Sequence, residues 1–121
     1  MHKVFVYGSL LKGLHNAYVL GDSNCIGKFE TKKEFKMYDI GAYPAITDGK
    51  QAIKGEVYEV DDEVLARLDR LEGISSGFYF RREVTIPKLG EKALIYVGGN
   101  VLEFADKVIE SGDYRTYLIN K

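Results

Sequence analysis

Residues 61–73 carry the clearest helical pattern in a chain whose other segments are mostly short and strand-like. The segment begins with acidic residues from Asp61 and ends at Gly73, which are typical start and stop signals of a helix. Leu65 and Leu68 fall at helical spacing on one side of it. An amphipathic helix among short strands is typical of an α+β fold, in which helices pack against a small sheet.

Glu72 lies at the end of this helix on the same side as Leu65 and Leu68. The last turn of a helix carries the negative end of the dipole, which disfavours an anion. Asp69, one turn earlier, adds a like charge. We therefore expect a raised pKa for Glu72, which is typical of a carboxyl group that transfers protons. The alternative is a frayed helix end with Glu72 in water.

Short apolar segments bounded by glycine or proline predict the strands. They cover residues 3–7, 34–40, 43–47, 52–60, 79–87 and 92–97. Residues 15–20 predict a helical turn or two, and a capping box from Asn100 to Glu103 opens a helical stripe that runs to Val108. Because strands dominate and several are short, we expect a small, curled or closed sheet with two or three flanking short helices.

The composition is ordinary for one globular domain over residues 1–121, with 45% apolar and 29% charged residues. The net charge of −1 gives no reason to expect nucleic acid or an anionic membrane as partner, and no apolar run approaches the roughly 20 residues of a membrane-spanning helix. No signal peptide is visible, and Cys25 is the only cysteine, so we expect a reducing, cytoplasmic location. Neither a metal nor a cofactor is predicted, and the pattern does not set the oligomeric state.

The turn from Tyr7 to Leu10 is a second candidate site feature. A strand that runs into Gly8 and Ser9 can present consecutive backbone N–H groups, and such a nest can bind a carboxylate or an oxyanion. No Gly-Lys-Ser/Thr follows, so the turn is not a phosphate-binding P-loop. A Gly-Ser turn after a strand is also found simply as a turn, so this pattern alone does not define a site.

Three further residues could belong to the same site. Tyr79 and Arg81 share one face of their predicted strand. Tyr79 could bring its hydroxyl near Glu72, whereas a pair between Arg81 and Glu72 would lower the pKa of that carboxyl group. Tyr43 could line a pocket or pack in the core.

An ordered set of motifs extends through almost the whole chain. It consists of Val6-Tyr7-Gly8-Ser9-Leu10 with Lys12-Gly13 and Asn16, Gly41-Ala42-Tyr43-Pro44-Ala45, Gly55-Glu56-Val57-Tyr58, Leu68-Asp69-Arg70-Leu71-Glu72-Gly73 with Tyr79 and Arg81, Ala93-Leu94-Ile95-Tyr96-Val97, and Ser111-Gly112-Asp113-Tyr114-Arg115. This set resembles the gamma-glutamylcyclotransferase-like family, also called AIG2-like, and especially short members similar to gamma-glutamylamine cyclotransferase. Ser9 stands where threonine is common among the short members, and Tyr114 stands where a tryptophan is often seen.

The resemblance implies a small mixed β-barrel and an activity. The implied substrate is a small γ-glutamyl amine or peptide, which is cyclised to 5-oxoproline with release of the amine. By resemblance, the turn Tyr7-Gly8-Ser9-Leu10 binds the glutamyl carboxylate end, Glu72 is the catalytic acid and base, and Tyr79 is a pocket tyrosine. Two alternatives are a binding module without turnover and a structural domain in which Glu72 caps a polar network in the core.

Overall fold

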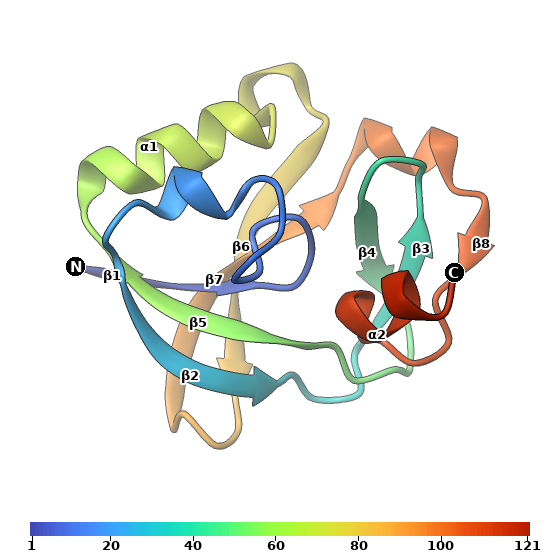
Figure 1. Cartoon of the computed structure of the whole chain (residues 1–121), viewed down its shortest axis with the longest axis horizontal. Coiled ribbons are helices and arrows are strands. Elements are labelled where there is room, and N and C mark those ends of the chain that lie inside the picture. Colours follow the sequence, from blue (N-terminus) through green and yellow to red (C-terminus); the bar gives the residue numbers. More distant parts are fainter.

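Two sheets and two α-helices make up the computed structural model, which describes residues 1–121 (Figure 1). The strands are β1 (His2–Val6), β2 (Asn24–Glu30), β3 (Phe35–Asp39), β4 (Pro44–Asp48), β5 (Lys54–Val60), β6 (Tyr79–Ile86), β7 (Glu91–Gly98) and β8 (Lys107–Val108). The helices are α1 (Asp62–Leu71) and α2 (Tyr114–Ile119), with short 3₁₀ helices η1 (Ala17–Leu20), η2 (Ile74–Ser76) and η3 (Asn100–Phe104). None of these helices is long and apolar enough to span a membrane. The α+β class predicted from the sequence is confirmed.

The larger sheet has the strand order β2-β5-β1-β7-β6 and the smaller one β4-β3-β8. In the larger sheet β1 is central, antiparallel to β5 and parallel to β7. Val4 and Phe5 of β1 are fully buried, as expected for a strand covered on both faces. The chain leaves this strand directly into the turn at Gly8, so the buried central strand of the sheet positions that turn.

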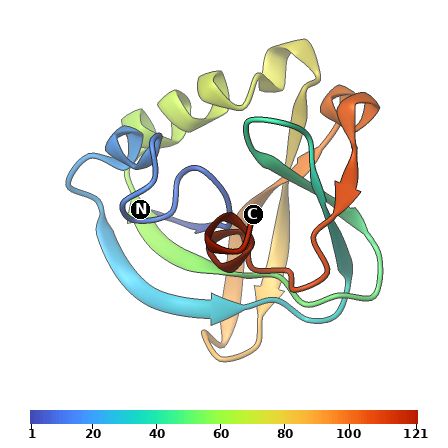
Figure 2. The ribbon, with the colours of Figure 1, turned by 45° about the vertical axis from the view of Figure 1, so that its right-hand side comes forward.

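The two sheets are not closed into a barrel. The larger sheet curls, as Figure 2 shows, but β2 and β6 remain at its edges. Because β3 pairs with β4 on one side and with β8 on the other, the smaller sheet keeps its own hydrogen bonds and does not continue the larger one. The barrel implied by the resemblance is therefore replaced by two adjacent sheets with open edges.

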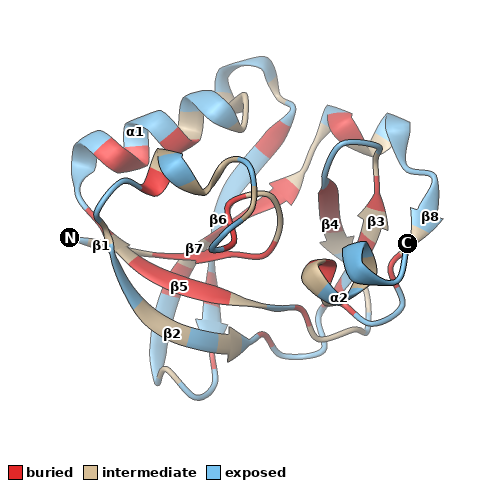
Figure 3. Ribbon diagram, viewed as in Figure 1, coloured by how far each residue is buried: buried red, intermediate tan, exposed pale blue.

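Helix α1 forms where the sequence predicts it. The Asp61 side chain accepts a hydrogen bond from the backbone N–H of Val64 at 2.8 Å and so caps the first turn. Val64, Leu65 and Leu68 are buried. The helix ends at Leu71, and Gly73, whose φ of 64° suits glycine, follows the capping residue Glu72. Figure 3 shows buried residues along one side of α1 and along β1 and β5. The helix thus lies with its apolar side on the core and its C-terminal end near the turn after β1.

The predicted helix from Val101 to Val108 is wrong beyond its first turn. The 3₁₀ helix η3 ends at Phe104, and Lys107 and Val108 form β8 instead. On the side away from β4, the edge of strand β3 is available for pairing. Here the backbone N–H of Asp106 donates to the carbonyl of Asp39 at 2.9 Å. Pairing with this edge satisfies the backbone groups that an α-helix would have satisfied, so the tertiary contact overrides the local helical pattern.

Candidate active site

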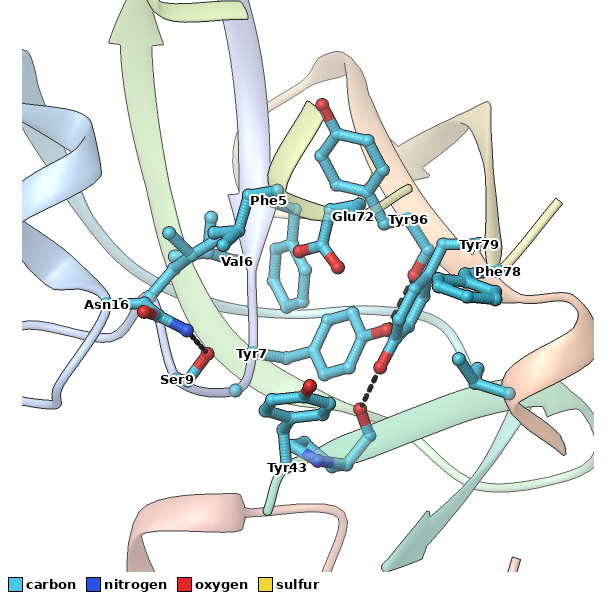
Figure 4. Close-up of a pocket in the computed structure, with 15 residues that line it drawn as sticks. Phe5, Val6, Tyr7, Ser9, Asn16, Tyr43, Glu72, Phe78, Tyr79 and Tyr96 are labelled. Atoms are coloured by element: carbon cyan, nitrogen blue, oxygen red, sulfur yellow. Dashed lines mark hydrogen bonds between the residues drawn. The ribbon is translucent and has the colours of Figure 1, made fainter. Parts of the chain in front are cut away.

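A pocket opens beside the C-terminal end of α1, where the two sheets meet (Figure 4). The six residues that the sequence singled out all line it, namely Tyr7, Gly8, Ser9, Leu10, Glu72 and Tyr79. They come from the turn after β1, the end of α1 and the first residue of β6. Glu72 is the one charged side chain in the lining. The fold therefore brings together segments that are more than sixty residues apart in the sequence.

Glu72 follows the last residue of α1 and keeps a helical backbone, with its N–H bonded to the carbonyl of Leu68 at 2.9 Å. Its carboxyl group points into the pocket and forms no hydrogen bond or ion pair with another side chain (Figure 4). Burial among the surrounding groups raises its pKa to about 7. Part of the residue stays accessible, because the carboxyl group faces the hollow of the pocket. The frayed, solvated end considered above is not observed.

Asp69 does not act on Glu72 as the sequence suggested. It accepts hydrogen bonds from the guanidinium of Arg81 and, at 2.7 Å, from the hydroxyl of Tyr96. Burial raises the pKa of Glu72, and the charge of Asp69 is not among the causes of this shift. Because Arg81 pairs with Asp69, the contact with Glu72 that would have lowered the pKa of this carboxyl group is also absent.

In the turn after β1, two carbonyls accept hydrogen bonds within the protein and three amides are free. The carbonyl of Gly8 accepts from the N–H of Leu11 at 2.9 Å, and the carbonyl of Ser9 accepts from the N–H of Asn16 at 3.0 Å. The Asn16 side chain also donates to the Ser9 hydroxyl at 2.8 Å. The N–H groups of Gly8, Ser9 and Leu10 donate to no acceptor in the protein. Three consecutive unpaired amides beside a pocket form the kind of nest that binds anions.

Glycine at position 8 is required by its neighbour across the pocket. A Cβ on Gly8 would lie 2.8 Å from Cγ of Pro44, closer than side-chain carbons pack. The sequence predicted only that Gly8 belongs to an amide nest, and the structure adds this contact with Pro44. The turn and the segment that carries Tyr43 and Pro44 are therefore in direct contact.

Two buried tyrosines form the wall of the pocket. The hydroxyl of Tyr7 donates to the carbonyl of Tyr96 at 2.6 Å, and the hydroxyl of Tyr79 donates to the carbonyl of Pro44 at 2.9 Å. Tyr79 thus does not donate to Glu72, in contrast to the contact considered from the sequence. Burial raises the pKa of Tyr79, and the nearby charge of Glu72 raises it further. Both tyrosines remain neutral hydrogen-bond donors near neutral pH.

Nine of the residues that line the pocket were not among the predicted site residues. Asn16 and Tyr96 occurred only within the motifs of the resemblance, and Tyr43 had been left open between pocket and core. Phe78 gave no signal in the sequence apart from being an aromatic residue after Gly77. No group of three or more His, Cys, Asp or Glu side chains is arranged to hold a metal ion.

Known proteins share both this fold and most of this chain. The sequence model of the family described as gamma-glutamyl cyclotransferase, AIG2-like, matches residues 4–116. A Vibrio cholerae protein provisionally named gamma-glutamylcyclotransferase is 42% identical over 113 residues, which are 93% of this chain and 95% of that protein. The crystal structure of an uncharacterised Pyrococcus horikoshii protein superposes with a TM-score of 0.82 at 30% identity and covers 99% of this chain and 95% of its own. The solution structure of Escherichia coli YtfP has a TM-score of 0.71 at 33% identity and covers 93% of this chain and 95% of its own.

The fold and the pocket therefore define a protein of the gamma-glutamylcyclotransferase type. Because the family match extends over nearly the whole sequence, this chain belongs to the gamma-glutamyl cyclotransferase, AIG2-like family.

Proposed function

We propose that this protein is a gamma-glutamylcyclotransferase that converts a γ-glutamyl amine or peptide into 5-oxoproline and a free amine. One observation carries the proposal: the unpaired Glu72 carboxyl group, with a pKa near 7, shares a pocket with three free backbone amides. We further propose that residues 1–121 act as one domain, because one hydrophobic core includes buried residues of both sheets.

The nest formed by Gly8, Ser9 and Leu10 would bind the α-carboxylate of the substrate. No cationic side chain lines the pocket, so backbone amides are the available partners for this anion. With the carboxylate there, the α-amine can face Glu72. The substrate then folds toward the five-membered ring, and such orientation can contribute several kcal/mol to the rate.

Glu72 would move one proton from the attacking nitrogen to the leaving nitrogen. An α-ammonium with a pKa of about 8 must lose a proton before it can attack. The ionised carboxylate accepts this proton, and the α-nitrogen then forms a bond to the γ-carbonyl carbon. As the bond from that carbon to the leaving nitrogen breaks, Glu72 returns the proton to the leaving nitrogen. The ring nitrogen loses its second surplus proton to solvent, which leaves the single N–H of 5-oxoproline. No water is consumed, and a positioned acid and base of this kind contributes about 10²–10⁴-fold.

Release of 5-oxoproline from a set of γ-glutamyl amines and peptides tests the proposal. We expect the unmodified protein to release 5-oxoproline and Glu72→Gln to lose at least about 10²-fold in kcat while it stays folded. Glu83→Gln, an exposed change of the same chemistry on β6, is the matched control and should keep full activity. If the protein binds γ-glutamyl compounds without releasing 5-oxoproline, it is a binding module and the proposal fails.

A further inference from the structure

Three exposed apolar side chains surround the opening of the pocket. Leu71 is 41% exposed, Phe78 51% and Tyr43 39%, and all three also line the pocket. Apolar groups that are left exposed together at the edge of a cavity typically mark a surface that a ligand covers. We call these three residues the apolar rim.

The backbone positions two residues of the rim, Leu71 and Phe78. Leu71 ends α1 and directly precedes Glu72. The N–H of Phe78 donates to the carbonyl of Gly73 at 3.1 Å, and its carbonyl accepts from the N–H of Gly99 at 2.8 Å. The ring of Phe78 packs over Gly73, where an added Cβ would lie 2.7 Å from the ring. The exposed ring is therefore a fixed part of the pocket and not a loose side chain.

Phe78 of the rim and the amide nest lie on different sides of Glu72. In Figure 4, Ser9 and Asn16 lie on one side of the Glu72 carboxyl group and Phe78 on the other. A glutamyl group with its carboxylate on the nest and its α-amine at Glu72 extends its γ-carbonyl away from the nest. The substituent on the leaving nitrogen then reaches the rim.

We propose that the apolar rim is the subsite for the leaving amine and selects γ-glutamyl amides of apolar amines. This inference rests on the proposed function. The rim offers no counter-charge to a cationic or anionic leaving group, because Glu72 is the one charged residue of the lining and already faces the α-amine. A charged substituent would lose hydration at the rim without gaining a partner. Removal of an apolar substituent from water favours its binding.

Binding of three probes to Glu72→Gln tests the rim without turnover. The probes are γ-glutamylbenzylamide, γ-glutamylmethylamide and γ-glutamyl-4-aminobutylamide, which share the glutamyl part and differ only in the leaving group. We expect the Kd of the benzylamide to be about tenfold lower than that of the methylamide. This factor is at the low end of the discrimination that one methylene gives in a closed apolar pocket, because the rim is open to water. The inference is overturned if the aminobutylamide binds as tightly as the benzylamide.

Phe78→Glu in the same background should reverse the preference. We expect it to lose the advantage of the benzylamide and to improve binding of the aminobutylamide severalfold. Phe80→Glu is the matched control, because Phe80 is 53% exposed and does not line the pocket. An equal effect of both changes contradicts the inference. If Phe78→Glu does not fold, the ranking of the three probes decides the question by itself.

Turnover by the unmodified protein separates this inference from the proposed function. If all three probes release 5-oxoproline and the aminobutylamide is preferred, the function stands and the inference about the rim fails. If none releases 5-oxoproline, the proposed function fails, and the binding ranking still decides whether the rim selects apolar groups.

Discussion

Glu72 makes the protein less stable when it is ionised. The folded state holds its pKa near 7 against an ordinary value of 4.5, so its favourable contribution is complete below about pH 4.5 and is lost as the pH rises through 7. Above pH 7 we expect Glu72→Gln to be more stable than the unmodified protein, by up to roughly 3 kcal/mol. Urea unfolding of both proteins between pH 4 and 8 measures the difference. A difference that does not change with pH would mean that Glu72 is fully solvated.

The pKa of Glu72 also sets the acidic limb of the profile of kcat/KM against pH. As a base, Glu72 must be ionised in the free enzyme, so kcat/KM should rise with pH to an apparent pKa of about 7. The profile should fall again where the substrate ammonium loses its proton, at about pH 8 or above. Initial rates of 5-oxoproline release across pH 5–10 give both limits. An acidic limb near pH 4.5 would show that burial does not raise the pKa of this carboxyl group in the free enzyme.

At the scale of elements, helix α2 supports the segment that carries Tyr43 and Pro44. Asp39 ends β3 just before this segment and accepts hydrogen bonds from the Tyr117 hydroxyl and from the N–H of Gly41. Burial acts to raise the pKa of Asp39, but these hydrogen bonds and the nearby Lys121 outweigh it, so the pKa is lowered. The carboxylate therefore stays ionised and ties α2 to one side of the pocket.

Tyr117→Phe should loosen this support without touching Glu72. A hydrogen bond to a charged group is stronger than one between neutral groups, so we expect a measurable loss of stability, reduced by competition from solvent at this partly exposed hydroxyl. KM should rise severalfold while kcat changes less, because the segment behind Tyr43 loses its anchor and the base does not move. Tyr18→Phe, at an exposed hydroxyl with no partner, is the control. An unchanged KM together with reduced stability would show that α2 stabilises the fold without affecting substrate binding.

The elements differ in how far the sequence could predict them. Helix α1 was predictable because its cap, apolar side and terminating glycine are all local. Strand β2 was missed because it is an edge strand whose register shifts between Cys25 and Gly27, which breaks the alternation of apolar and polar residues. The helix expected up to Val108 failed for the opposite reason. Its local signal was clear, but the free edge of β3 offered the backbone a better partner.

At the scale of the whole molecule, the parts of the site could be predicted from the sequence, but their assembly could not. The buried position of Glu72 followed from helical spacing, and the amide nest at Gly8 followed from a strand that runs into a turn. That the two face one pocket came only from the resemblance, because long-range contacts leave no periodic pattern. The same is true of Pro44, which contacts Gly8 and Tyr79 across the two sheets.

Pro44 makes a coupling between distant residues testable. Tyr79 in the larger sheet donates to the carbonyl of Pro44 in the smaller sheet, and Gly8 packs against the same proline ring. Tyr79→Phe should reduce stability by about 0.5–1.5 kcal/mol and lower kcat/KM far less than Glu72→Gln does. Gly8→Ala should push Pro44 away and raise KM, because the nest and the proline cannot both keep their places.

Because both changes act through Pro44, their effects should not add. Once Gly8→Ala has displaced the proline, the Tyr79 hydroxyl has already lost its acceptor. Tyr79→Phe should therefore lower the unfolding free energy less in the Gly8→Ala background than in the unmodified protein. Unfolding free energies and KM for the two single variants and the double variant measure this coupling. Tyr79→Phe combined with Tyr18→Phe is the additive control, since Tyr18 is exposed and lies outside the pocket. Additive effects of Gly8→Ala and Tyr79→Phe would show that the two sheets hold the pocket independently.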